Sequence, residues 1–307
     1  MAELWLLCEG DSDIPVLAAV LTRVLAADII PKPSGGSSNA PSAAEYVARH
    51  HGQQGVTVAY LVDRDYCQRS VADATFTDKK RGFMWRRHAI ESYLLAPAVI
   101  VEAFRSLKAS AASSPGGGPS WVKTLPGDEA VVIAGLRAAA TARAPEEALR
   151  LAVQRLWEDL SDTAGRIQKR APSIPGVAHP DAAACRTALL DEVARLVAKA
   201  QEAAVSPYLE AASVCARYDG ELARVSGQTY LNNLHYLEEF HGKDLASAFL
   251  EWLQREHKAG LSKKLFIREL EKTISGVYEA NRLLYGTDDF LELANGVRAL
   301  GGLPAIA

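Results

Sequence analysis

The chain has 307 residues, of which 49% are hydrophobic and 23% charged, a composition typical of a globular protein of one or two domains. Its formal net charge of −3 excludes binding to nucleic acid or membranes through the overall field, so local charge must do such work. The four cysteines lack CxxC or Cys/His spacing, which argues against structural zinc and a disulfide framework. Without a signal sequence or a long uncharged apolar stretch, we expect a cytoplasmic protein that does not use membranes.

The first hundred residues alternate between apolar runs and helical spacing. The runs at 4–8 and 56–62 have no polar alternation, as in strands covered on both faces. The alternation predicts an α/β fold with a mostly parallel sheet. Further strands are predicted at 29–30 and 83–85, a loop at 64–80, and helices at 14–25, 42–51 (with a Ser42/Glu45 capping box) and 97–104.

The remaining chain has a different character. Residues 109–119 read as a flexible Ser/Gly-rich joint, and 128–225 are rich in Ala, Leu, Arg and Glu with helical spacing. Pro172, Pro175 and Pro180 are expected to break this stretch. We therefore predict an α/β core at 1–110, a mainly α-helical insertion at 120–228, and a helical C-terminal region at 229–307 that completes the core.

Carboxylates follow both predicted core strands. Glu9 and Gly10 end the first, with Asp13 three residues later, and Asp63 and Asp65 end the second. The carboxyl ends of parallel strands are where open α/β sheets bind ligands. In an extended strand Asp63 and Asp65 would point to the same side, and their repulsion would need a cation or an arginine to compensate it; Mg²⁺, which prefers oxygen ligands, fits.

These motifs resemble the Toprim domain, found in topoisomerases, primases and OLD-family nucleases. Glu9-Gly10-x-x-Asp13 and Asp63-x-Asp65 are similar to its acidic motifs. The segment 88–95 (HAIESYLL) resembles a motif of stand-alone bacterial Toprim proteins, which include the nuclease effector of the PARIS anti-phage system. The sequence departs from that motif at Ala89 and Ser92. His241-Gly242-Lys243-Asp244 resembles a late element that supplies a catalytic lysine.

The resemblance implies a Rossmann-like Toprim core and a metal-dependent endonuclease acting on DNA or RNA, with tRNA among the candidates. It implies one or two Mg²⁺ ions, replaceable by Mn²⁺, and an antiviral defence role. The chain has no P-loop motif, so a controlling ABC or OLD-type ATPase would be a separate partner. The oligomeric state, including a homodimer, is left open. The implied metal ligands are Glu9, Asp13, Asp63, Asp65 and Glu91; Glu9, Asp63, Asp65 and Lys243 would be catalytic.

Basic residues lie near the acidic motifs in the sequence. Lys79, Lys80, Arg81, Arg86 and Arg87 form a local patch that is a candidate contact for the phosphate backbone of a nucleic acid. Alone, the same residues would be read as a solvated loop.

Each assignment has an ordinary alternative. Asp13 is also explained by helix capping, Glu91 by an ion pair with Arg86 or Arg87, and Lys243 as a surface lysine. His88 is more simply a packed histidine than a ligand. For the whole chain, the alternatives are a non-catalytic nucleic-acid-binding or regulatory Toprim module, and a topoisomerase or primase fragment. The latter lacks the expected tyrosine context and zinc motif.

Overall fold

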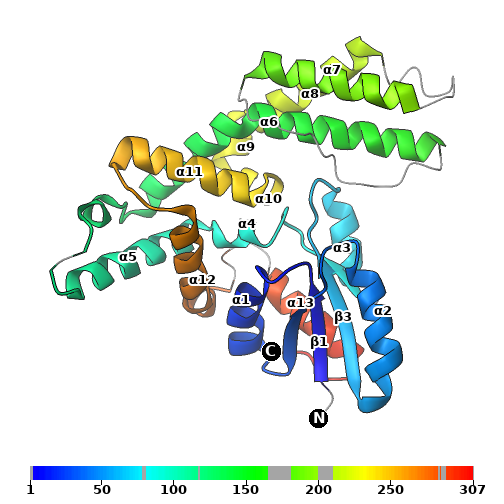
Figure 1. The fold of residues 1–307 in the computed structure, drawn as a ribbon, viewed down its shortest axis with the longest axis vertical. Coiled ribbons are helices and arrows are strands. Elements are labelled where there is room, and N and C mark those ends of the chain that lie inside the picture. The colour runs from blue at the N-terminus through cyan, green and yellow to red at the C-terminus, as the bar shows by residue number, and fades with distance from the viewer. Residues whose placement is uncertain are drawn as a thin grey trace. The chain divides into compact units, whose positions relative to one another are not determined.

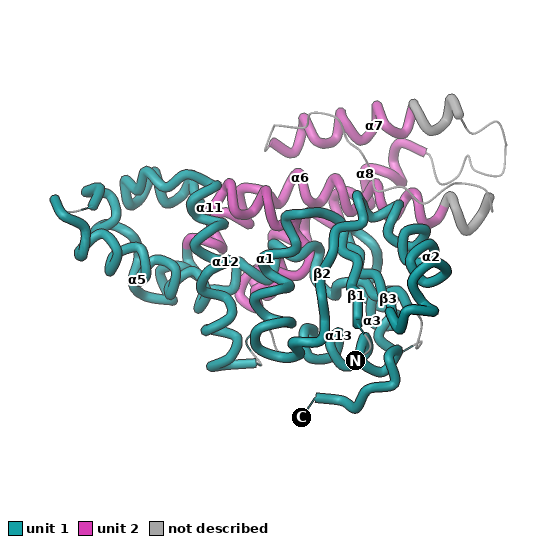
Figure 2. Tube along the Cα trace, turned by 60° about the horizontal axis from the view of Figure 1, so that its bottom comes forward, with its two compact units in different colours: residues 1–134, 250–307 teal, residues 135–249 magenta. Residues whose placement is uncertain are grey.

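The computed structural model describes residues 3–77, 81–116, 118–164, 181–199, 210–282, 284 and 288–306. The chain divides into two compact units, which Figure 2 colours separately. The first unit joins Met1–Ala134 to Leu250–Ala307, and the second is Gly135–Phe249. These divisions fall later in the chain than the expected boundaries near 120 and 228, and the first unit takes residues from both ends of the chain.

A parallel sheet of four strands forms the centre of the first unit (Figure 1). The strand order is β2-β1-β3-β4, and every neighbouring pair is parallel. This confirms the predicted α/β class and its parallel sheet, followed by a largely helical region. The strands are β1 (Glu3–Cys8), β2 (Ile29–Pro33), β3 (Val56–Val62) and β4 (Gly82–Met84).

Helix α2 (Ala40–His51) covers one face of this sheet through a small apolar cluster of Leu7, Val58 and Ala44. The predicted capping box is wrong, because the helix begins at Ala40 and Ser42 lies inside it. Glu45 instead pairs with Arg49 one turn further along.

Helix α13 (Asp289–Leu300) covers the opposite face, at close range. A Cβ atom added to Gly296 would lie 2.6 Å from Phe83 Cε1, and one added to Gly301, 2.5 Å from Leu4 Cδ2. A larger residue at either position would require the Phe83 or Leu4 side chain to move or α13 to shift. The last helix of the chain is therefore fitted against the first and the fourth strands.

The predicted helix at 14–25 is present, but its form is unexpected. A short α1 (Ile14–Leu17) continues as a π-helix, η1 (Ala18–Leu25). At its end the Ala26 N–H donates to the Leu21 carbonyl at 2.6 Å, a spacing of five residues. Apolar spacing does not distinguish α from π turns, so the sequence could not show the difference.

The predicted loop at 64–80 contains a helix, α3 (Arg69–Thr77). Only Ala72 of this helix is fully buried, so the helix needs no apolar stripe and its sequence has none. The helix is attached to the sheet by a polar contact, in which the Met84 N–H donates to Thr75 Oγ1 at 3.0 Å. The prediction of a loop here was therefore wrong for want of apolar periodicity.

The rest of the first unit is helical. The long α5 (Pro97–Ser113) packs on α12 (Lys263–Ala280) through Phe104 and Phe266, and it includes the first part of the expected flexible joint. This unit also has three short helices: the 3₁₀-helix η2 (Gly52–Gln54) follows α2, α4 (Glu91–Leu94) follows β4, and the 3₁₀-helix η3 (Ser120–Thr124) follows α5.

The second unit is helical, as the composition predicted. Its longest helix is α6, which continues through Pro145, a residue that supplies no backbone donor. The prolines expected to interrupt the region, Pro172, Pro175 and Pro180, lie outside the described residues. Over the described ranges, no helix combines the length and apolarity needed to cross a membrane. The helices are α6 (Glu129–Ala164), α7 (Ala182–Lys199), α8 (Ala211–Val225), α9 (Gln228–Asn232), α10 (Tyr236–Glu239) and α11 (Gly242–His257); α6 and α11 each begin or end in the first unit.

Candidate active site

The carboxyl ends of β1 and β3 bring the first two predicted site residues together. Glu9 and Asp63 each directly follow a strand, and the two strands are parallel neighbours. The Asp63 N–H donates to Glu9 Oε1 at 3.0 Å, so the Glu9 side chain bridges the two strand ends. One carboxylate oxygen of Glu9 therefore serves the fold, while a carboxylate has capacity for further contacts.

Asp13 closes the turn between β1 and α1. Its Oδ2 accepts from the Gly10 N–H at 3.2 Å, and its Oδ1 accepts from the Ser12 hydroxyl at 3.2 Å. Asp13 occupies the N-cap position of α1, but its side chain bonds backward to the turn instead of to the helix. The side chain is buried, which holds a charge close to the strand ends.

Asp65 reaches the site by a route that differs from the expected one. Strand β3 ends at Val62, and Asp65 adopts a left-handed backbone with φ of 50°. The expectation that Asp63 and Asp65 share one face of an extended strand is therefore wrong. The Asp65 N–H donates to the His88 carbonyl at 2.9 Å, and this bond joins the loop after β3 to the segment before α4.

That segment delivers Glu91, the first residue of α4, which is buried. His88 is also buried, and its ring packs edge-on against Tyr66 with centroids 4.6 Å apart. This agrees with the simpler expectation for His88, a packed histidine. Glu91 thus joins the other four acidic residues, and we call Glu9, Asp13, Asp63, Asp65 and Glu91 the carboxylate cluster.

The acids of the carboxylate cluster act on one another electrostatically. Burial raises the pKa of Asp63 well above its usual value, and the charges of Glu9, Glu91, Asp13 and Asp65 raise it further. Burial also raises the pKa of Glu9, with Asp65 and Asp13 adding to the effect and the Asp63 N–H opposing it. Like charges held together in this way favour either a shared proton or a bound cation.

The chemistry of the donors fits a hard divalent cation. All five side chains offer carboxylate oxygens, the ligands that Mg²⁺ prefers, and Mg²⁺ commonly needs only one or two of them beside water and substrate. Within the part of the chain that the structure describes, no three Asp, Glu, His or Cys side chains form a ready ligand group. Binding would therefore require rotation of these side chains, whose backbone positions are already set.

The predicted basic patch divides into exposed, engaged and undescribed residues. Arg81 is exposed, whereas Lys79 and Lys80 lie outside the described residues. Arg86 donates to Asp73 at 2.6 Å, and Arg87 is buried, with its guanidinium 5.3 Å from the centre of the Tyr93 ring. The structure thus uses Arg86 and Arg87 inside the fold, which counts against a direct role for them in phosphate binding.

Two acidic residues near the site had no signal in the sequence. Burial and the charge of Glu91 raise the pKa of Glu271 on α12, so the negative region extends to that helix. Asp289 at the start of α13 accepts a hydrogen bond from the Tyr93 hydroxyl at 2.5 Å. Both residues come from the far end of the chain, and neither lies in a recognisable motif.

Lys243, the remaining predicted catalytic residue, belongs to the second unit. It is the second residue of α11, which begins at Gly242. The start of α11 is fixed to α6: Arg150 Nη1 donates to Asp244 Oδ2 at 2.8 Å, and the His241 N–H donates to Glu147 Oε1 at 3.3 Å. The predicted helix around Lys243 is present, and the catalytic role of Lys243 stays a prediction.

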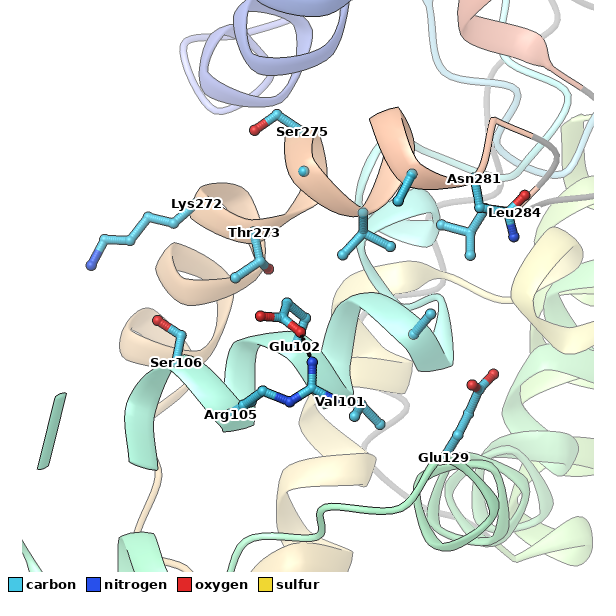
Figure 3. A pocket seen from close by; sticks show the side chains of 14 residues that line it. Val101, Glu102, Arg105, Ser106, Glu129, Lys272, Thr273, Ser275, Asn281 and Leu284 are labelled. Atoms are coloured by element: carbon cyan, nitrogen blue, oxygen red, sulfur yellow. Dashed lines mark hydrogen bonds and ion pairs between the residues drawn. The ribbon is translucent and has the colours of Figure 1, made fainter. Parts of the chain in front are cut away.

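A cavity of about 770 Å³ is lined mainly by residues of α5 and α12 (Figure 3). Three of its charged lining residues have ion-pair partners: Arg105 pairs with Glu102, and Lys272 Nζ lies 2.7 Å from Glu269 Oε1. None of its lining residues belongs to the carboxylate cluster. We therefore place the candidate site at the sheet edge instead of in this cavity.

Comparison with known proteins does not assign a family. No protein-family model matches the chain, and a search of curated proteins finds no related sequence.

Proposed function

We propose that this chain is a Mg²⁺-dependent nuclease that hydrolyses phosphodiester bonds in DNA or RNA. The observation that supports the proposal is the environment of Asp63, a carboxylate at the end of a central parallel strand with four others around it. Ligand sites of open α/β sheets form at this edge, and strongly perturbed acids tend to mark functional sites. The Toprim resemblance of the same residues points to the same chemistry.

In this proposal the carboxylate cluster holds one or two Mg²⁺ ions, for which Mn²⁺ can substitute. Bound there, Mg²⁺ would supply an activated water and offset the negative charge that develops on the phosphate. Glu9 would keep its hydrogen bond to the Asp63 N–H and offer its second oxygen, so that the two strand ends stay joined. The cation would offset the repulsion that Asp63 experiences from the neighbouring acids.

Lys243 would contribute a positive charge toward the phosphate, as the resemblance implies. Its backbone is fixed by the contacts between α6 and the start of α11, which limits the conformations available to the side chain. A compact ammonium suits the non-bridging or leaving oxygens of a phosphodiester. Of the predicted contacts to the phosphate backbone of a nucleic acid, Arg81 is supported best among the described residues, because its side chain is exposed.

A free nuclease would harm its host, and the sequence has no P-loop of its own. We therefore propose that a separate ABC or OLD-type ATPase controls the chain in an anti-phage defence system. The helical region is the proposed interface. Co-expression with the proposed cognate ATPase should give low toxicity until the system is triggered. A stable complex with that ATPase after deletion of 128–225 would contradict this interface.

A non-catalytic nucleic-acid-binding or regulatory role is the second candidate, and one observation favours it. Glu9 and Asp13 each accept backbone N–H groups at turns, which explains two acids of the carboxylate cluster by local structure alone. In that case the chain would bind nucleic acid without cutting it, and Mg²⁺ would have little effect.

The deciding experiment compares the wild type with Asp63→Asn plus Asp65→Asn. Purified proteins are incubated with plasmid DNA and, separately, with tRNA, with Mg²⁺, with Mn²⁺ or with EDTA. We expect metal-dependent cleavage by the wild type and none by the double variant, which should keep its fold because repelling charges are removed. Asp11→Asn, an exposed acid beside the same strand end, is the matched control and should cleave normally.

Two results would overturn the proposal. Cleavage that survives in the double variant would remove the carboxylate cluster from the reaction. Nucleic-acid binding by the wild type without cleavage of either substrate would establish the non-catalytic alternative.

A further inference from the structure

Asp289 contacts both ends of the segment that carries Glu91. Its Oδ1 lies 2.7 Å from Arg86 Nη1, and its Oδ2 accepts from the Tyr93 hydroxyl at 2.5 Å. The Asp289 side chain is only 3% exposed, so both contacts are made out of water. Charge-assisted hydrogen bonds in such surroundings are stronger than exposed ones and fix geometry more tightly.

The contact between Asp289 and Tyr93 fixes the position of the Tyr93 end of the segment. The Tyr93 side chain is fully buried, and its hydroxyl donates to Asp289 Oδ2 at 2.5 Å. The rings of Tyr93, Trp85 and Phe290 all pack against one another, with the Tyr93 centroid 4.8 Å from that of Trp85 and 5.2 Å from that of Phe290. Tyr93 and Asp289 therefore act as one packed unit that joins α4 to α13.

Arg86 provides the second end of this arrangement. Its guanidinium also contacts Asp73 at 2.6 Å and Glu292 at 2.7 Å, and these two partners are both half exposed. Asp289 is the buried member of the three, so it fixes where Arg86 lies, while the other two neutralise charge at the surface. With Tyr93 held too, residues 86–93 are anchored at each end.

Between these anchors lie one backbone contact to the loop after β3 and one member of the carboxylate cluster. The His88 carbonyl accepts from the Asp65 N–H, and Glu91 starts α4 within reach of the charge of Asp63. A shift of the segment would therefore move Glu91 relative to Asp63 and loosen the loop that holds Asp65. Carboxylates that support metal ligands from outside commonly act in this way.

We propose that Asp289 is a positioning residue for Glu91, and that it sets the metal affinity of the carboxylate cluster by anchoring residues 86–93. The metal-binding half of this proposal rests on the proposed function. Asp289 itself touches neither substrate nor metal. It acts through Arg86 and Tyr93 from the last helix of the first unit.

The test uses Asp289→Ala in the full chain, with Asp28→Ala as the matched control. Asp28 pairs with Arg298 near the other end of α13, so its loss should loosen the same helix without touching residues 86–93. Asp289→Asn keeps the side-chain shape and one acceptor oxygen and should be intermediate. Tyr93→Phe removes one of the two contacts while keeping the ring, and it serves if the alanine variant fails to fold.

The first measurement is amide hydrogen exchange, which needs neither metal nor substrate. We expect exchange in residues 86–93 to rise about tenfold or more in Asp289→Ala, because a local anchor is lost. Asp28→Ala should leave that segment unchanged. Equal exchange in the wild type and Asp289→Ala, or an equal rise in both alanine variants, would overturn the anchoring.

The second measurement is Mg²⁺ binding by calorimetry, together with the Mg²⁺ dependence of cleavage. Loss of an outer support should weaken metal binding by about 10- to 100-fold in Asp289→Ala and less in Asp289→Asn. Saturating Mg²⁺ should restore most of the cleavage rate, a rescue that general unfolding would not show. Unchanged affinity, or a rate that excess Mg²⁺ does not restore, would overturn the positioning role.

The two proposals fail differently. A wild type that neither binds Mg²⁺ nor cleaves overturns the proposed function and the metal half of this inference with it, whatever the exchange data show. A wild type that does both, with Asp289→Ala indistinguishable from Asp28→Ala, overturns this inference alone.

Discussion

Asp63 in the first unit and Asp244 in the second are both partly buried carboxylates, and their surroundings move their pKa values in opposite directions. Burial and four neighbouring acids raise the pKa of Asp63. Hydrogen bonding with His241, with Arg150 adding its charge, lowers the pKa of Asp244 despite burial. Burial alone thus does not decide how an acid titrates; the sign of the nearest charges does.

The two regions differ in what their charges accomplish. Around Arg150, buried Glu146 and Glu147 are balanced by a guanidinium that contacts both, at 2.6 Å and 3.0 Å. Such a region holds helices in place. At the carboxylate cluster, negative charge accumulates at a strand edge, which costs stability and is the usual sign of a site that binds something positive.

The largest expected effect tests whether the second unit, which contains Arg150 and Lys243, also takes part in the reaction. Lys243→Ala removes a charge that the proposal aims at the phosphate, so single-turnover cleavage should fall by about 10²–10³. Mg²⁺ affinity should change less than about threefold, because Lys243 would act on the transition state and not on the metal. Calorimetry and rapid-quench cleavage measure the two effects. No loss of rate, or an equal loss of metal binding, would make Lys243 an ordinary lysine.

The next effect concerns stability in the second unit. Arg150→Ala leaves Glu146 and Glu147 without their shared cation, and breaking such a pair costs about 3 kcal/mol. Chemical denaturation of the full chain, with hydrogen exchange in α11 as the local signal, would measure it. Arg155→Ala on the same helix is the control, since its partner Glu158 lies in a more exposed pair worth about 1 kcal/mol or less. Equal losses of unfolding free energy in the two variants would show that Arg150 contributes no more to stability than an exposed ion pair does.

A smaller effect of opposite sign is expected at Asp63. Its pKa in the folded protein lies above the 3.8 of an unfolded chain, so the folded state binds more protons between about pH 4 and that raised value. Stability therefore falls as pH rises across this window and stays reduced above it. Asp63→Asn should stabilise the metal-free protein at pH 7 by about 1 kcal/mol and flatten this pH dependence.

Asp244 provides the contrasting control for this pH series. Its pKa is lowered in the folded protein, so its contribution is present above about pH 4 and is lost as pH falls. Asp244→Asn should therefore destabilise at pH 7. If both variants changed stability in the same direction at pH 7, measured by urea unfolding in EDTA, the contrast between the regions would be wrong.

The smallest effect shows how far the negative region extends. Glu271 on α12 is partly exposed, and burial together with Glu91 raises its pKa. Glu271→Gln should stabilise the metal-free protein by no more than about 0.5 kcal/mol, since solvent screens the charge. Glu279→Gln, an exposed acid on the same helix, is the control. A larger gain for Glu279→Gln would exclude Glu271 from the region.

The sequence predicted the sheet and its acidic edge because both depend on short, local patterns. The apolar runs before Glu9 and Asp63 could hardly be anything but buried strands, and parallel pairing then brings their ends together. Helix α3 was missed because a helix with little buried surface has no apolar stripe. The π-turns after Leu17 were missed because their apolar spacing resembles that of an α-helix.

The supporting residues could not be predicted from local patterns. Asp289 reaches Tyr93 across 196 positions of sequence, and Arg150 reaches Asp244 across 94. Nothing near either acid in the sequence indicates its partner. The predicted use of Arg86 on a phosphate was drawn from composition, and it took no account of acids that only folding brings to that arginine.

The close fit of α13 against the strands has a consequence for the order in which the chain folds during synthesis. The sheet is made early, but the face that Gly296 and Gly301 allow α13 to cover stays open until translation has passed Leu300. The second unit, continuous from Gly135 to Phe249, can fold while the first still waits. Ribosome-bound chains that stop before α13 should therefore expose apolar strand surface and depend on chaperones, and a premature stop codon there should yield aggregated protein instead of a smaller folded one.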